Sequence, residues 1–203
     1  MRETRECNRE DKTLLSTYCK EIEECLHLIT TNKDIEKSIK TLTEHIIEAS
    51  KKDRITVILG NGGSAADAQH FAAELVCTFE NRHRKGIKAL ALNTDTSILT
   101  AWSNDFEFES VFARQVETLG KTVGVCIGLS TSGKSRNVIN ALRAAKEVDA
   151  KCWLISGHES TQQGNTNTIR LPSTRTATVQ TLTQIVFHTI CAEVESEICK
   201  DMC

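Results

Sequence analysis

A glycine-rich turn between a buried strand and a helix is the first feature of this sequence that could bind a ligand. Residues 55–74, ITVILGNGGSAADAQHFAAE, begin with a nearly continuous aliphatic run, as in a parallel strand covered on both faces. The glycines that follow, Gly60, Gly62 and Gly63, permit positive φ and let the backbone approach a ligand closely. Ser64 is expected to cap the next helix, whose free amides attract anions. The stretch therefore predicts a cradle of the size of a phosphate.

A histidine and a glutamate follow on the same predicted helix. His70 and Glu74 lie four residues apart, so they share one helical face and point the same way. A phosphate cradle followed by an aligned His–Glu pair is an unusual combination, and one interpretation is a functional site. The alternative is an ordinary strand-to-helix turn beside a solvated His–Glu pair, and these residues alone leave both interpretations open.

A second turn, rich in hydroxyl groups, follows another buried strand at residues 123–129. The hydroxyls stand beside the free amides of a helix N-terminus and belong to Ser130, Thr131, Ser132 and Ser135. This arrangement suits a phosphate dianion without Lys or Arg, whereas the alternative is a capped helix that binds nothing. Neither turn is a nucleotide motif, because GxxxxGK(S/T) is absent and GNGGS lacks the spacing and the ribose-binding acid of a dinucleotide fingerprint.

Length and composition indicate one cytoplasmic domain. The 203 residues fit a single domain, residues 1–203, with room for a core. A net charge of −2 provides no bulk attraction to nucleic acid or to an anionic membrane. No apolar run approaches the length of a membrane helix, and the N-terminus is too charged for a signal peptide. Nine scattered cysteines without a CxxC pair indicate reduced thiols in the cytoplasm.

Strands alternate with helices along the chain, which predicts a mostly parallel, doubly wound sheet. The expected strands are residues 55–59, 88–92, 123–129, 151–155 and 168–171. Ligands bind at the carboxyl ends of the strands in such a sheet, and both polar turns lie at that edge because each directly follows a strand.

The two ends of the chain have different expected roles. Residues 1–10 are expected to be disordered, and residues 176–200 are expected to form a long helix. Two amphipathic helices within residues 11–52 carry more apolar surface than one edge of a sheet can cover. We therefore expect one of them to pack against another subunit.

Four segments together resemble the phosphoheptose isomerases of the sugar isomerase (SIS) domain family. They are GNGGSAADAQHFAAEL, ALNTDTSILTAWSNDFEFESVFARQVE, STSGKSRNVINAL and the VQ…FH pattern of the last helix, and the similarity covers nearly the whole chain. The resemblance implies an α/β fold, a flavodoxin-like three-layer αβα sandwich with a mostly parallel five-stranded sheet, two leading helices and a long C-terminal helix. It also implies a homotetramer with sites between subunits and one zinc ion per site.

The resemblance also implies an activity and a set of site residues. Phosphoheptose isomerases convert sedoheptulose 7-phosphate to D-glycero-D-manno-heptose 7-phosphate. The positions that match the family's metal ligands are His70, Glu74, Gln180 and His188. The implied substrate-binding positions are Asn61, Gly62, Gly63, Ser64, Asn104, Asp105, Ser130, Thr131, Ser132, Ser135 and Gln180.

The chain departs from the family pattern in three places. Thr78 stands where an Arg is usual, Ala177 stands where an Asp is usual, and Val179-Gln180-Thr181 reads VQT where IQE is usual. These departures bear on substrate affinity and rate, but they leave the implied metal set complete.

The implied metal set poses a geometric question at the C-terminal helix. Gln180 and His188 are eight residues apart, a rise of about 12 Å along a helix, whereas zinc ligands lie only about 2 Å from the ion. The two side chains must lean toward each other or belong to different subunits. The residues alone also allow His188 to be a core histidine.

The implied reaction moves a proton between C1 and C2 of a sugar through an enediol, with one base, one acid and an electrophile for the oxyanion. We assign Glu74 as the base on carbon and His188 as its partner acid–base, with the metal orienting the two oxygens. The rival interpretations are non-catalytic SIS-domain proteins, either a tetramer that associates with a replication initiator or a sugar-phosphate sensor. The initiator-associating group generally lacks a histidine at the position of His188.

Overall fold

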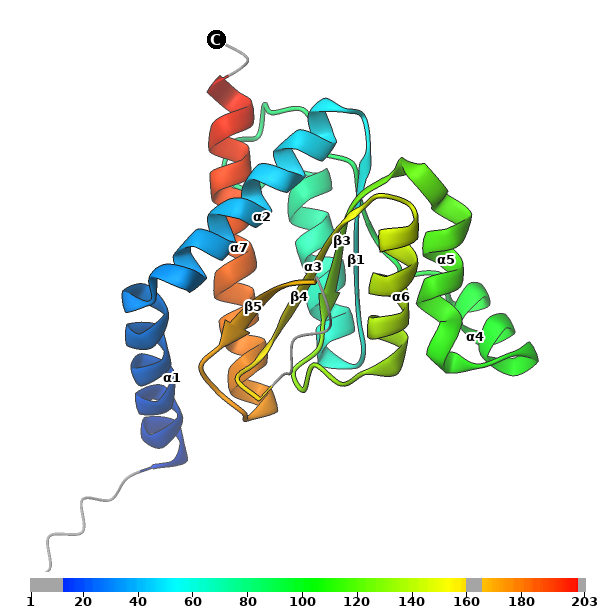
Figure 1. Cartoon of the computed structure of the whole chain (residues 1–203). Helices are drawn as coiled ribbons and strands as arrows, with labels where there is room; N and C mark the ends of the chain where they lie inside the picture. The colour runs from blue at the N-terminus through cyan, green and yellow to red at the C-terminus, as the bar shows by residue number, and fades with distance from the viewer. Residues whose placement is uncertain (1–12, 160–165, 201–203) are drawn as a thin grey trace, which may run out of the picture.

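Five parallel strands form the sheet that the alternating pattern predicts, so the predicted fold class is confirmed (Figure 1). The computed structural model describes residues 13–159 and 166–200, and the expected disorder of residues 1–10 lies outside them. The strands are β1 (Ile55–Gly60), β2 (Ala89–Ala91), β3 (Val123–Leu129), β4 (Lys151–Gly157) and β5 (Asn167–Leu171). They lie in the order β2-β1-β3-β4-β5, and all four pairings are parallel.

Helices cover both faces of the sheet. They are α1 (Leu14–Thr31), α2 (Lys33–Lys51), α3 (Gly63–Val76), α4 (Thr96–Asp105), α5 (Val111–Leu119), α6 (Arg136–Glu147) and α7 (Thr176–Lys200), with short 3-10 turns η1 (Phe108–Ser110) and η2 (Gly120–Thr122). Within the described ranges, no helix combines the length and apolar character needed to cross a membrane. The seven cysteines in those ranges are all free thiols.

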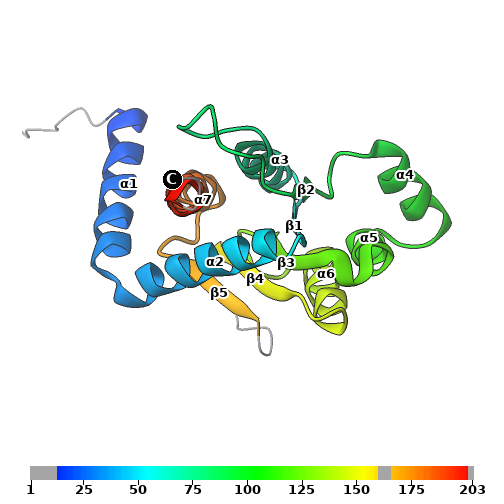
Figure 2. The ribbon, with the colours of Figure 1, turned by 90° about the horizontal axis from the view of Figure 1, so that it is seen from above.

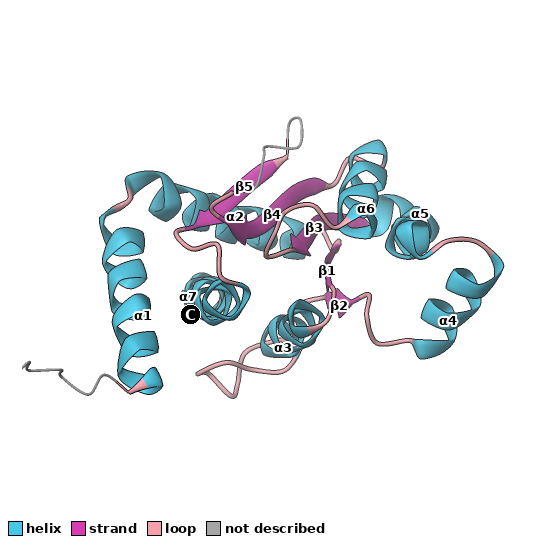
Figure 3. Cartoon of the chain, turned by 90° about the horizontal axis from the view of Figure 1, so that it is seen from below, coloured by secondary structure: helices cyan, strands magenta, loops and turns pink. Residues whose placement is uncertain are grey.

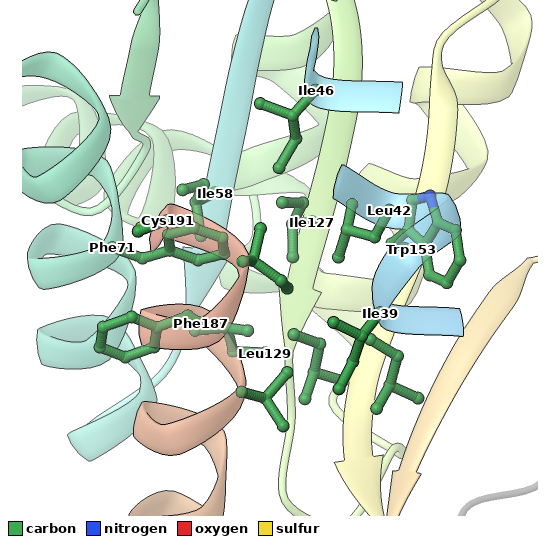
Figure 4. Packing of buried hydrophobic residues seen from close by; sticks show 14 of the residues in the cluster. Ile39, Leu42, Ile46, Ile58, Phe71, Ile127, Leu129, Trp153, Phe187 and Cys191 are labelled. Carbon is green, nitrogen blue, oxygen red and sulfur yellow. The ribbon is translucent and has the colours of Figure 1, made fainter. Parts of the chain in front are cut away.

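The two faces of the sheet bury separate hydrophobic clusters, which gives the fold its three layers. On β1, Val57 and Leu59 face the cluster beneath α5 and α6, while Ile58 faces the opposite cluster beneath α2, α3 and α7. This alternation follows from the two-residue period of a strand, which points successive side chains to opposite faces. Figure 4 shows the second cluster, in which the rings of Phe71 from α3 and Phe187 from α7 stack on each other.

The helices α3 and α7 lie side by side and run in the same direction, and Figures 2 and 3 look along both axes. Their contacts advance by about one turn on each helix, pairing Gly63 with Gln180, Asp67 with Gln184, and Phe71 with Phe187. A position on α3 therefore has a fixed neighbour on α7, although more than a hundred residues separate the two in sequence.

The two predicted polar turns meet where the strand order reverses. The chain passes from β1 to β2 on one side and then returns to β3 on the other, so the turns after β1 and β3 flank a topological switch point. Two reciprocal side-chain hydrogen bonds join the first turn to the start of α6, which directly follows the second turn: Asn61 Nδ2 to Asn137 Oδ1 at 2.9 Å and Asn137 Nδ2 to Asn61 Oδ1 at 2.8 Å. Within the first turn, the end of β1 lies close against the start of α3, because a methyl group on Gly60 would lie 2.7 Å from the carbonyl oxygen of Ser64.

Candidate active site

Three side chains from two distant segments converge between α3 and α7. His70 and Glu74 come from α3, and His188 comes from α7. One ligand atom from each lies within 4.8 Å of the other two. His70 Nε2 and Glu74 Oε1 are 3.1 Å apart, and the rings of His70 and His188 meet edge to face with centroids 5.1 Å apart. The parallel packing of the two helices brings the residues together, because position 70 faces position 188.

Aromatic rings contact both imidazoles. Phe187 contacts both, with ring centroids 5.1 Å from His70 and 4.5 Å from His188. Phe79, from the loop after α3, stacks on the ring of His188 with centroids 5.7 Å apart. Burial and the neighbouring His70 lower the pKa of His188 below its ordinary value, although Glu74 acts in the opposite direction. His188 is therefore neutral at pH 7, with a nitrogen lone pair free to bind a metal or accept a proton.

The donor set fits a catalytic zinc site. Two imidazoles and a carboxylate are a known three-ligand set for catalytic zinc, which leaves the fourth position for water or substrate. Ligands about 2.1 Å from one ion lie at most about 4.2 Å apart, so a spacing of up to 4.8 Å closes on an ion with small side-chain rotations. His70 has the freedom for such a rotation, since 43% of its side chain is exposed.

Gln180, the fourth implied ligand, is not brought to this triad. Its side-chain amide lies against Gly63 at the start of α3, where an added methyl group would collide with it. His188 is eight residues further along the same straight helix, about 12 Å away along the axis. Within one chain, Gln180 therefore belongs to the phosphate-sized turn and not to the His–Glu–His cluster.

The hydroxyl-rich turn after β3 has the shape of an anion cradle. Gly133 takes a positive φ of 67°, which turns the chain into α6. Ser130 Oγ lies 3.0 Å from Ser135 Oγ, and Ser132 Oγ accepts a hydrogen bond from the backbone N–H of Lys134. A small cavity of about 90 Å³ opens beside Thr131 and Ser132.

The same small cavity reveals two hydroxyls that sequence reasoning missed. Thr174 and Thr176, at the start of α7, line it together with Thr131 and Ser132. No local pattern marks them, because they reach the turn only when the N-terminus of α7 docks beside the end of β4. Their position adds a second helix N-terminus to the predicted phosphate site.

Two of the predicted site residues, Asn61 and Ser64, differ from the simplest expectation, whereas Gly62 between them has a positive φ of the kind expected for this turn. Ser64 does not cap α3, because the helix begins at Gly63 with Gly62 as the preceding residue, and Ser64 is buried in the first turn. Gly62 takes a positive φ of 57°, which a residue with a side chain rarely adopts. The side chain of Asn61 is occupied by Asn137, so it joins the first turn to the start of α6 and does not point freely at a ligand.

Asn104 and Asp105 stand apart from the triad within one chain. They end α4, which lies on the β2 side of the molecule, at the opposite edge from α1 and away from α7 (Figures 2 and 3). Both side chains are exposed, and Asn104 Nδ2 donates a hydrogen bond to Asp105 Oδ1 at 2.9 Å. Nothing in the structure explains the departures at Thr78 and Ala177.

Asp67 is a buried carboxyl that sequence reasoning did not single out. It lies on α3 between Ser64 and His70, and its Oδ1 accepts a hydrogen bond from Gln184. Burial raises its pKa, although Gln184 and His70 act in the opposite direction. Its Oδ2 has no hydrogen-bond partner among the described residues. The carboxyl thus lies between the phosphate-sized turn and the triad.

The chain combines a parallel sheet between two helical layers, polar turns at the switch point of that sheet, and a His–Glu–His cluster. Comparison with known proteins shows to which family a chain with this fold and this site belongs. Residues 17–157 match the SIS domain family. The structure superposes on that of a phosphoheptose isomerase from Francisella tularensis with a TM-score of 0.82, at 22% identity over 90% of this chain and 96% of the other. At that identity, the likeness shows the fold alone.

Two relatives are similar enough in sequence to narrow the class. Phosphoheptose isomerase 1 of Campylobacter jejuni is 42% identical over 178 residues, which are 87% of this chain and 95% of the relative. A phosphoheptose isomerase from Neisseria gonorrhoeae has a TM-score of 0.74 and 34% identity over 91% of this chain and all of the other (100%). The chain belongs to the SIS domain family and, within it, to the phosphoheptose isomerases.

Proposed function

We propose that this protein is an aldose–ketose isomerase that converts sedoheptulose 7-phosphate to D-glycero-D-manno-heptose 7-phosphate. The convergence of His70, Glu74 and His188 from two distant helices is the observation that carries the proposal. A sugar-phosphate sensor needs the polar turns but not this cluster. The names of the relatives support the substrate, since those relatives are phosphoheptose isomerases.

Glu74 and His188 divide the proton transfers of this reaction. Glu74 removes a proton from C1 of the ketose, which gives an enediolate with its negative charge on the C2 oxygen; once a proton has moved from the C1 oxygen to the C2 oxygen, Glu74 returns its own proton to C2. His188, neutral at pH 7, moves the proton between the C1 and C2 oxygens. His70 holds the Glu74 carboxylate at 3.1 Å and so orients it for this transfer.

Zinc is the metal that we propose for the His70, Glu74 and His188 cluster. When bound, it polarises the sugar oxygens and stabilises the negative charge that develops during enolisation. Glu74 then has two tasks, because ligation lowers the basicity that proton removal requires. Of the three residues that would hold the ion, only Glu74 would also take a proton from carbon, since His70 and His188 have no role on carbon.

The substrate phosphate lies at the other end of α3 and α7 in this proposal. The backbone at Gly62, Gly63 and Ser64 and the hydroxyls of Ser130, Thr131, Ser132 and Ser135 hold it, together with the amide of Gln180. From Gly63 to His70 the helix rises about 10 Å. A phosphate at C7 and a reacting carbon at C1 are the two ends of a long sugar, so this separation favours a heptose over a triose.

A homotetramer with sites between subunits is the assembly that we propose. Exposed apolar side chains support it: Leu14 and Leu15 on α1 are 91% and 72% exposed, and Phe106 after α4 is 67% exposed. Shared sites also give roles to residues that lie outside the triad of their own chain. Asp105 would reach the sugar of a neighbouring subunit, and any ligation of zinc by Gln180 would occur in a neighbour's site. The free thiols fit a cytoplasmic location.

An assay on the purified protein tests this function. We expect protein with about one zinc ion per chain to interconvert the two heptose phosphates, and chelation followed by added Zn²⁺ to abolish and restore turnover. Sedimentation equilibrium of the same sample should give the mass of four chains. Binding of sedoheptulose 7-phosphate without turnover in the zinc-loaded protein would identify a sensor and contradict the proposal.

Substitution of Gly63 by Ala should weaken phosphate binding specifically. The added methyl group collides with the amide of Gln180 and displaces it from the turn. Losing one or two hydrogen bonds of about 1 kcal/mol each lowers affinity roughly tenfold. Calorimetric titration with inorganic phosphate measures this loss.

Gly120→Ala is the matched control for this substitution. A methyl group at Gly120 meets nothing within 4 Å, yet a φ of 55° strains the variant, so it reports lost stability without a change at the turn. Equal phosphate affinity in Gly63→Ala and the native protein would place the phosphate elsewhere.

A further inference from the structure

The most deeply buried ion pair in the described part of the chain lies beside the His–Glu–His cluster and has no part in the proposed chemistry. Arg84 Nε and Glu195 Oε2 are 2.5 Å apart, and their side chains are only 1% and 6% exposed. Burying two charges carries a desolvation penalty that their attraction often fails to repay, so such a pair is weak evidence for stability alone. Its hydrogen bonds indicate another role.

Arg84 binds the end of the helix that carries Glu74. Its guanidinium donates to the carbonyl oxygen of Glu74 at 2.5 Å and to that of Leu75 at 2.9 Å. These carbonyls belong to the last turn of α3, where helical hydrogen bonds run out and a cation is favoured by the helix dipole. The position of the Glu74 backbone is therefore tied directly to Arg84.

Glu195 binds the loop that carries the aromatic neighbour of His188. Its carboxylate accepts three consecutive backbone hydrogen bonds, from Phe79 at 3.0 Å, Glu80 at 2.7 Å and Asn81 at 2.6 Å. Phe79 is the residue whose ring stacks on His188. Glu195 itself is on α7, seven residues after His188 and so on the same side of that helix. Burial raises its pKa, but these hydrogen bonds and Arg84 outweigh burial and lower it, so the group is ionised.

We propose that the Arg84–Glu195 pair is a positioning device that sets the distance between Glu74 on α3 and His188 on α7. Its two ends hold the last turn of one helix and the side of the other, and its bonds to the intervening loop place Phe79 against the His188 ring. Neither residue belongs to the His–Glu–His cluster or to the polar turns. The inference rests on the proposed roles of Glu74 and His188 and adds the residues that hold them in register.

Zinc titration of the metal-free protein tests the role of the pair. Arg84→Lys keeps the charge but loses the planar fork that reaches two carbonyls, and Glu195→Gln keeps the shape but loses the charge. We expect each to weaken zinc binding about 10- to 100-fold, as loss of an outer hydrogen-bonding partner does at metal sites. Affinity for inorganic phosphate should stay within about twofold of the native protein, because the phosphate turn is at the far end of both helices.

Arg54→Lys is the matched control. Arg54 also clamps backbone carbonyls, those of Lys121 and Val123, but it lies just before β1 and contacts neither α3 nor α7 through its side-chain bonds. The Arg54→Lys substitution should lower the melting temperature of the metal-free protein without changing its affinity for zinc. A lower melting temperature alone therefore does not distinguish the Arg84→Lys variant from the Arg54→Lys variant, whereas a change in zinc affinity does.

Hydrogen exchange of the metal-free protein provides a readout that needs neither zinc nor turnover. In Glu195→Gln, the amides of residues 79–81 should exchange at least about tenfold faster than in the native protein, while those of the turn after β3 keep their rates. If Arg84→Lys does not fold, Glu195→Gln decides the question alone. Unchanged zinc affinity and unchanged exchange in a folded variant would overturn the positioning role, whereas a native protein that binds no zinc would instead overturn the proposed function.

Discussion

Glu74→Gln should lower kcat by at least about 10²-fold, because an amide cannot take a proton from carbon and a positioned general base contributes about 10²- to 10⁴-fold. The side chain keeps its size and remains one turn from His70, so the fold should be unaffected. The rate of conversion of sedoheptulose 7-phosphate measures the loss. The assay is run under saturating Zn²⁺, which compensates for any weaker metal binding by the variant.

Solvent exchange isolates the step that Glu74 performs. In D₂O the native protein should incorporate deuterium at C1 of the ketose, and Glu74→Gln should lose this exchange in proportion to the loss of conversion. Glu80→Gln is the matched control, since Glu80 is an exposed carboxylate on the nearby loop and should give native rates. A Glu74→Gln protein that converts its substrate at the native rate would rule out Glu74 as the base.

His188→Gln is the second substitution with a large expected effect, again at least about 10²-fold in kcat. The variant loses the group that moves a proton between the C1 and C2 oxygens, and it also loses one imidazole donor of the zinc cluster. The pattern of loss should differ from that of Glu74→Gln, because removal of the C1 proton precedes the transfer between oxygens.

The ratio of deuterium exchange to conversion therefore reports the role of His188. We expect the ratio to rise in His188→Gln under saturating Zn²⁺, since Glu74 still removes the C1 proton while product formation slows. An unchanged ratio would mean that His188 serves only as a ligand. His83→Gln is a suitable control, because His83 lies on the loop after α3 and its side chain is exposed.

The arrangement of the sheet was predictable because parallel strands have a strong local signal. Buried strands such as Val123–Leu129 are continuous aliphatic runs, and each is followed by a turn whose glycines and hydroxyls mark the carboxyl edge. Residue types also predicted the pairing of His70 with Glu74, since both lie on one helix and one turn separates them. The matched segments of the family supplied His188 as their partner, which no local pattern indicates.

Residues that meet through packing were not predictable in the same way. Thr174 and Thr176 reach the turn after β3 only because α7 starts there, and Arg84 finds Glu195 across 111 positions of sequence. Sequence reasoning also mistook Ser64 for a helix cap, because the helix begins two residues earlier than that cap implies, where Gly62 supplies the positive φ that the turn requires.

The amino-acid sequence by itself determined the parallel sheet, the two polar turns at one edge and the His–Glu pair on α3, since each depends on neighbours within a few residues. Only the tertiary structure decided which residues of α7 face that pair. The parallel packing of α3 and α7 sets His188 beside His70 and Glu74, and the same straight helix holds Gln180 two turns away at the phosphate end. A helix rises by a fixed amount per residue, so one docking register settles both positions at once.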